Sequence, residues 1–129
     1  MQNTSQPITT FESHCEVSIY KEEKPTADVL AWAVKTLRAC YPETDVLVFD
    51  ILLERFKANN WGNDKIKDSI NHLIENHVYK TINPANVLRF DRQKKLYTYN
   101  QLLNMVNTGD KFDKYKRIEV NGKAYWERQ

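Results

Sequence analysis

The residues of this sequence best suited to chemistry are cations and aromatic rings near its C-terminal end. Residues 115–129 read YKRIEVNGKAYWERQ, in which Lys and Arg are interleaved with Tyr and Trp. Lys and Arg side chains neutralise phosphate groups, and aromatic rings accept stacked bases or pack on sugars. The pattern therefore favours an anionic partner with planar rings, which in proteins is most often nucleic acid.

The charge distribution agrees with this interpretation. Residues 86–129 carry ten bases and five acids, whereas residues 1–45 carry four bases and seven acids. A basic stretch is the electrostatic footprint of an anionic partner, although charges also cluster on ordinary solvated surfaces. We expect nucleic acid to be contacted by Arg92, Lys94, Lys95, Lys116, Arg117, Lys123, Trp126 and Arg128.

No constellation of residues indicates an enzyme or a metal protein. His72 and His77 lie five positions apart, or about 140° around a helix, which does not suit two ligands of one ion. Cys15 and Cys40 stand in no recognisable nucleophile context, and two cysteines are too few for a disulfide scaffold. With three glycines in all, the chain has no phosphate-cradling loop. We expect a non-enzymatic protein with no metal and no cofactor.

A β-hairpin is the element expected to position the C-terminal cations. Asn121-Gly122 stands between two runs rich in β-branched and aromatic residues, which is the strongest short-range signal for a two-residue turn. Such a turn fixes the register, so that Val120 faces Lys123 and alternate residues share a face. The face expected to be buried presents Ile118, Val120 and Tyr125. The face expected to point outward presents Tyr115, Arg117, Trp126 and Arg128.

Arg117 and Trp126 face each other in this register, and two interpretations remain open. In one, the Arg117 guanidinium lies on the Trp126 ring, worth about 0.5–1 kcal/mol at an exposed site, and the pair serves nucleic acid. In the other, Trp126 covers a gap in the helical body and Arg117 shields it. Both require the hairpin to dock on helices, because two strands alone are not stable.

Five helices are expected upstream of the hairpin. Apolar residues recur at helical spacing, and capping signals such as Asn83 before Pro84 mark the starts. The expected starts are near Thr26, at Thr44 or Asp45, at Asn63 or Asp64, at Asn83 and at Thr98. The fifth helix carries Asn100, Gln101, Asn104 and Asn107, which suit base or phosphate contacts as well as a solvated face. The run DRQKK at residues 91–95 is expected to be a solvated basic loop.

The predicted fold class is mainly α, a compact five-helix domain with a C-terminal β-hairpin. A winged-helix-like arrangement is one option for it, although the third helix lies about forty residues before the hairpin. Residues 1–24 begin with many Ser, Thr, Gln and Asn residues, and we expect a flexible or weakly docked arm. Residues 25–129 are expected to form a single helical domain that ends in the hairpin at 115–129. No apolar run approaches a membrane span and the first twenty residues do not read as a secretory signal, so we expect a cytoplasmic protein without a membrane partner.

Residues 45–56 read DVLVFDILLERF and residues 64–77 read DKIKDSINHLIENH. They are followed by Tyr79-Lys80-Thr81-Ile82-Asn83-Pro84 and a short helix. With these features, residues 46–91 resemble the small helical loader and inhibitor proteins of phage replicative helicases. The resemblance implies an all-helical adaptor that binds a helicase, and it carries over no individual functional residue.

Together these observations predict a nucleic-acid-associated accessory protein of phage or mobile-element replication or regulation, with DNA favoured over RNA. The alternative is a protein–protein adaptor, similar to helicase loaders, which binds a replication protein and no nucleic acid. The sequence leaves the oligomeric state open.

Overall fold

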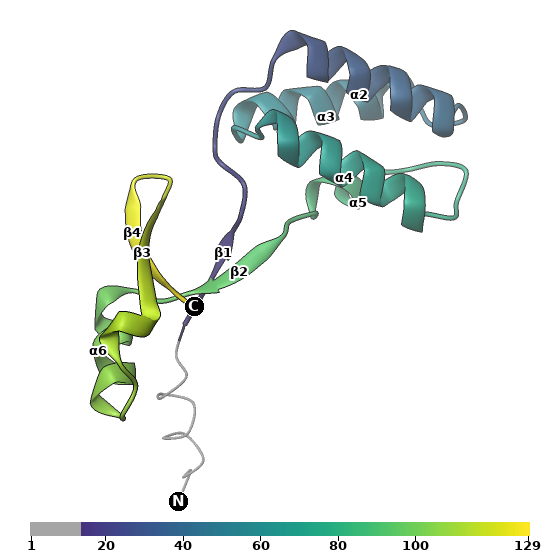
Figure 1. The fold of residues 1–129 in the computed structure, drawn as a ribbon. Coiled ribbons are helices and arrows are strands. Elements are labelled where there is room, and N and C mark those ends of the chain that lie inside the picture. Colours follow the sequence, from purple (N-terminus) through teal and green to yellow (C-terminus); the bar gives the residue numbers. More distant parts are fainter. Residues whose placement is uncertain (1–13) are drawn as a thin grey trace, which may run out of the picture. The chain divides into compact units, whose positions relative to one another are not determined.

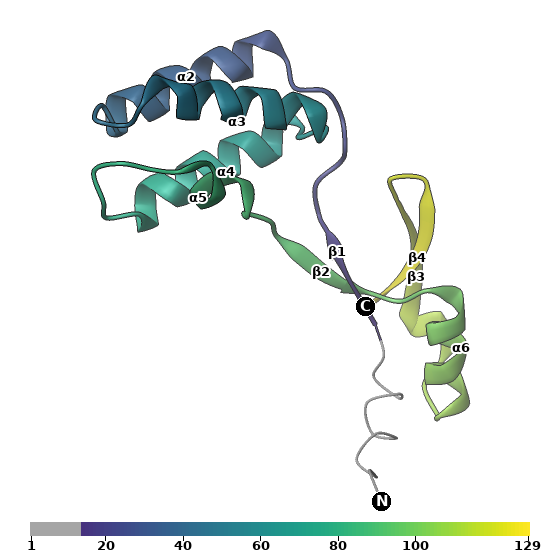
Figure 2. The ribbon, with the colours of Figure 1, turned by 180° about the vertical axis from the view of Figure 1, so that it is seen from behind.

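The computed structural model describes residues 14–129, which group into two compact units. The helical unit comprises Tyr20–Arg92, and the hairpin unit comprises residues 14–19 together with residues 93–129 (Figures 1 and 2). The N-terminal arm was predicted to end at residue 24, whereas the two units divide after residue 19. The reason is that residues 15–18 pair with a strand from the later part of the chain. The formation of a single folding domain stays a prediction, and residues 1–13 of the predicted arm lie outside the described residues.

The helical unit contains α2 (Ala27–Cys40), α3 (Val46–Ala58), α4 (Asn63–Asn76) and α5 (Pro84–Leu88). Helix α2 packs on α4, and the short α5 packs on both α3 and α4 (Figure 1). Apolar residues at helical spacing meet in one core, in which Leu37, Leu52, Phe56 and Ile70 are almost fully buried. Each such burial contributes roughly 1.5–3 kcal/mol.

Capping side chains set the starts of the helices of this unit. Thr26, Asp45 and Asn83 each accept a hydrogen bond from a backbone N–H of the first turn, as predicted. The predicted cap of α4 is wrong, because Gly62 occupies the N-cap position and Asn63 is already helical. The Asn63 side chain instead accepts a hydrogen bond from the Thr26 N–H at 3.0 Å, which joins the starts of α2 and α4.

The segment before α2 is held against the helical unit. The Tyr20 hydroxyl donates a hydrogen bond to Asp68 of α4 at 2.8 Å, and its ring lies 6.1 Å from that of Phe90. Glu22 forms a β-bridge with Trp61, which extends the attachment. Burial, followed by the hydrogen bond and charge of Asp68, raises the pKa of Tyr20 to about 12.

The hairpin unit contains β1 (Cys15–Ser18), β2 (Gln93–Leu96), α6 (Tyr99–Asn107), the 3₁₀ turn η1 (Phe112–Lys114), β3 (Tyr115–Val120) and β4 (Lys123–Arg128). Strand β1 pairs antiparallel with β2, and β3 pairs antiparallel with β4. The predicted basic loop at 91–95 is therefore wrong for residues 93–95, which lie in β2. Gln and Lys give no apolar alternation, and the pairing partner lies far upstream, so the sequence showed no local signal for this strand.

The predicted mainly α fold class with a C-terminal β-hairpin is confirmed by the elements of the two units. The described residues contain five α-helices, α2 to α6, and end in an antiparallel β-hairpin. Thr98 caps α6 through a capping box with Gln101, at the predicted start. Within residues 14–129, no helix combines the length and the apolar character that crossing a membrane requires.

Candidate nucleic-acid interface

The hairpin pairs in the register that the sequence predicted, with Val120 facing Lys123 at the turn. Asn121 and Gly122 have φ angles of 49° and 84°, the positive values that a type I′ turn requires. The register places Lys116 and Lys123 on one face, four strand positions apart. This spacing corresponds to about 13 Å along the strands.

The burial of the two hairpin faces differs from the prediction. Tyr115 is buried, and Trp126 packs against the apolar cluster formed with α6. The Trp126 ring lies 5.5 Å from that of Tyr99, the first residue of α6, so this face docks on α6. Figure 1 shows the hairpin strands next to α6. The outward orientation predicted for Tyr115 and Trp126 is wrong, because aromatic rings bury about 150–250 Å² each and docking them removes more apolar surface from water than docking Ile or Val.

Asp110 fixes the open end of the hairpin. Its carboxylate accepts a hydrogen bond from the Tyr115 hydroxyl at 2.5 Å and pairs with the Arg128 guanidinium. The guanidinium also donates to the Tyr115 hydroxyl oxygen at 3.2 Å. The hydrogen bond from Tyr115 lowers the pKa of Asp110, and the Lys111 N–H and Arg128 act in the same direction. Arg128, a predicted nucleic-acid contact, is thus already paired with Asp110 of its own unit.

Two further predicted contacts have acidic neighbours. The Lys94 ammonium lies 3.4 Å from Glu127, and the Arg117 guanidinium lies 3.9 Å from Glu119. Within the described residues, Arg117 makes no cation–π contact with Trp126. The Arg117 guanidinium therefore does not stack on the Trp126 ring in this fold.

Five exposed lysines of the hairpin unit form no ion pair with a described residue. They are Lys95, Lys111, Lys114, Lys116 and Lys123. Lys111 and Lys114 were not among the predicted contacts, although the charge count of residues 86–129 includes them. Residues 111–115 read KFDKY, in which Phe112 is 47% exposed and Asp113 stands between the ring and Lys114. The two lysines and two aromatic residues within five positions are the signal that indicates them.

The charge balance differs between the units. The hairpin unit holds eight bases and five acids in residues 14–19 and 93–129, whereas the helical unit holds eleven of each. Four of the five acids in the hairpin unit have a basic neighbour in that unit: Glu16, Asp110, Glu119 and Glu127. The surplus positive charge therefore resides on lysines that have no acidic partner in the part of the chain described.

Arg92 belongs to the helical unit, where its guanidinium carbon lies 5.6 Å from the centre of the Phe90 ring. The part played in nucleic-acid binding by this residue and by the seven predicted contacts of the hairpin unit stays a prediction. Among residues 14–129, no group of three or more His, Cys, Asp or Glu side chains lies close enough together to hold a metal ion.

No family model, no curated protein and no solved structure matches this chain. The resemblance of residues 46–91 to helicase loader and inhibitor proteins stays a prediction.

Proposed function

We propose that this chain is a non-enzymatic, nucleic-acid-associated accessory protein whose hairpin unit binds a phosphate backbone. The observation that carries the proposal is the set of five lysines without an acidic partner among the described residues. Lysines that internal acids do not neutralise remain available to phosphates, and binding gains free energy from the counterions that they release.

The shape of the hairpin supports DNA as the partner in this proposal. A two-stranded ribbon fits the major groove of B-DNA, which is about 12 Å wide, whereas the major groove of A-form RNA is too deep and narrow for side chains to read. Lys116 and Lys123 lie about 13 Å apart along one face, so each of them can reach a different phosphate of the backbone. Tyr125 lies between them on the same face and is partly exposed.

The experiment that tests this proposal is a titration of fluorescent single- and double-stranded oligonucleotides, followed by anisotropy, at several salt concentrations. With three phosphate contacts, the affinity for duplex DNA should fall about 40-fold between 50 and 200 mM salt. The double variant Lys116→Gln/Lys123→Gln should reduce the slope of log affinity against log salt by about 1.8.

The matched control is Lys35→Gln/Lys67→Gln, which removes two exposed lysines from α2 and α4 of the helical unit. It lowers the net charge by the same amount, so a general charge effect would weaken both double variants equally. Equal weakening, or no binding to DNA or RNA by the unaltered chain at 50 mM salt, would refute the proposal.

A second candidate function is the protein–protein adaptor, which an exposed apolar surface on α3 favours. Val46, Leu47 and Ile51 are 57%, 62% and 43% exposed. Leu47 and Ile51 lie one helical turn apart and so share a face, and apolar patches of this kind often mark interaction sites. The partner proposed from the resemblance is a replication protein of a phage or mobile element, in the cytoplasm. Loss of its capture by Leu47→Asp/Ile51→Asp, with DNA binding unchanged, would support this function.

A further inference from the structure

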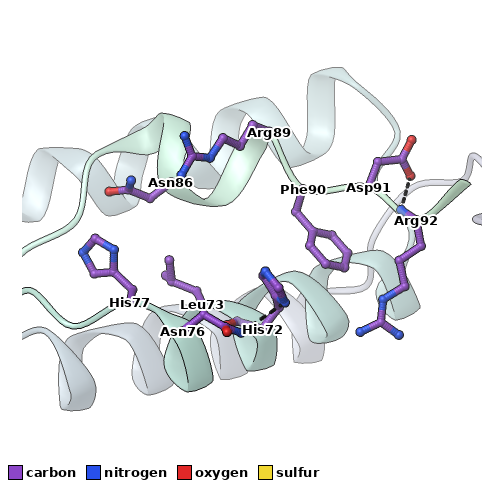
Figure 3. A pocket seen from close by; sticks show the side chains of 9 residues that line it. All are labelled: His72, Leu73, Asn76, His77, Asn86, Arg89, Phe90, Asp91 and Arg92. Atoms are coloured by element: carbon purple, nitrogen blue, oxygen red, sulfur yellow. Dashed lines mark hydrogen bonds between the residues drawn. The ribbon is translucent and has the colours of Figure 1, made fainter.

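A cavity of about 530 Å³ opens in the helical unit between α4 and the residues at and after α5. His72, Asn76 and His77 line the α4 side, and Asn86 and Arg89 line the α5 side (Figure 3). The volume falls within the range of about 300–1,000 Å³ that is usual for small-molecule sites. None of the five lysines of the proposed interface lines this cavity, although Arg92, which the sequence predicted as a nucleic-acid contact, does.

Hydrogen bonds within the cavity wall determine which polar atoms can reach a ligand. The Asn83 N–H donates to Asn86 Oδ1 at 2.8 Å, which orients the Asn86 amide and leaves its nitrogen as a donor. The Asn76 amide nitrogen lies 3.3 Å from His72 Nδ1 and can only donate to it. The same amide nitrogen donates to the His72 carbonyl oxygen at 2.8 Å, so the Asn76 amide is held by α4 itself.

The charges around the cavity favour an anion. Arg89 and Arg92 contribute two guanidinium groups, and neither forms an ion pair with a described carboxylate. The acid of the lining, Asp91, has Lys65 at 3.8 Å. Arg89 and Asn86 lie three residues apart at α5 and so project to the same side, where a fork of N–H donors suits the oxygens of a phosphate.

Aromatic rings supply a second type of surface in the same cavity. The Phe90 ring lies 5.3 Å from the His72 ring, and both line the cavity (Figure 3). At the other end of the α4 lining, the His77 ring lies 5.4 Å from Tyr79, which is 72% exposed. Planar rings of this kind accept a stacked heteroaromatic base.

We propose that this cavity binds a nucleoside monophosphate, with the phosphate on Arg89 and Asn86 and the base against Phe90 and His72. Donors and permanent positive charge select the phosphate, and the aromatic wall selects the base. Inorganic phosphate alone meets only the first requirement, and a nucleoside alone meets only the second. The nucleotide therefore binds more tightly than either of its parts.

Isothermal titration calorimetry of the full chain with AMP, inorganic phosphate and adenosine tests this assignment. AMP should bind about tenfold or more tightly than inorganic phosphate or adenosine. The variant Arg89→Gln should weaken AMP binding about tenfold or more, because it removes a charge-assisted pair of hydrogen bonds. The control Arg55→Gln makes the same change at an exposed residue of α3 outside the cavity lining, and its affinity for AMP should stay within about twofold.

Amide chemical shifts measured during the AMP titration locate the ligand. Changes at His72, Phe90 and Arg89 that saturate with the calorimetric affinity support the proposal. It is overturned by absence of AMP binding at millimolar concentration, by equal affinities for AMP and inorganic phosphate, or by equal losses in Arg89→Gln and Arg55→Gln. Unchanged chemical shifts elsewhere in Arg89→Gln establish that the variant is folded, so a loss of binding reports on the site.

Discussion

The substitution Tyr20→Phe removes a single hydroxyl from the segment that is held against α4. That hydroxyl donates to Asp68 at 2.8 Å, and Tyr20 is only 8% exposed. A hydrogen bond to a charged group contributes about 1.5–3 kcal/mol. Because the ring remains, packing against Phe90 is kept and no cavity forms. We expect the free energy of unfolding to fall by about 2 kcal/mol.

The pKa of Tyr20 determines how the stability of this attachment depends on pH. Burial, then the hydrogen bond and the charge of Asp68, raise this pKa from 10.0 to about 12. One pKa unit corresponds to about 1.4 kcal/mol, so the folded state favours the protonated phenol by roughly 2–3 kcal/mol. Because the higher pKa belongs to the folded state, this contribution is complete below pH 10.0 and is lost as the pH rises towards about 12.

Urea unfolding followed by far-ultraviolet circular dichroism, at pH 8 and at pH 11, measures both effects. The unaltered chain should exceed Tyr20→Phe by about 2 kcal/mol at pH 8, and the difference should shrink at pH 11 because Phe cannot ionise. The control is Tyr41→Phe, since the Tyr41 hydroxyl donates to the neutral Leu73 carbonyl at 3.3 Å. Equal losses in the two variants, or a difference for Tyr20→Phe that does not change with pH, would refute the reasoning.

Two further predictions concern the hairpin unit. Gly122 has a φ of 84°, and a Cβ added to it would have no heavy atom within 4 Å. Gly122→Ala should therefore lower the free energy of unfolding by about 1 kcal/mol through backbone strain alone, as measured by urea unfolding. An unchanged urea midpoint would contradict the type I′ turn. The lowered pKa of Asp110 means that its carboxylate stabilises the fold above the ordinary carboxyl pKa, and that this contribution is lost as the pH falls through the lowered value. Asp110→Asn should therefore be less stable than the unaltered chain at pH 7 and lose less stability on acidification, with urea unfolding followed by far-ultraviolet circular dichroism as the readout. Parallel acid titrations of the two proteins would contradict this.

Some features of this fold follow from residues that are close together in the sequence. The turn at Asn121-Gly122 requires two positive φ angles, and these residue types adopt them readily, so the hairpin register was predictable. The starts of α2, α3, α5 and α6 were predictable for a similar reason, because a capping side chain satisfies backbone groups only a few residues away. Helical spacing of apolar residues likewise identified the five helices.

The candidate interface was predictable only in part. Lys95, Lys116 and Lys123 were predicted from charge and remain without an acidic partner among the described residues. Lys94 and Arg128 were predicted with them but pair with acids, and such pairing depends on which side chains the fold brings together. Charge counting gives the sign of a surface, and it does not identify the individual cations that stay available.

The sequence by itself determined the five helices, the hairpin register and the basic character of the C-terminal third. Only the tertiary structure decided that Tyr115 and Trp126 dock on α6, that Gln93–Leu96 pairs with Cys15–Ser18, and that Arg89 and Phe90 line a cavity with α4. Local steric and hydrogen-bonding preferences act over a few residues and can be read along the chain. Burial, strand pairing and cavity formation depend on contacts between residues far apart in sequence, and these exist only once the chain has folded.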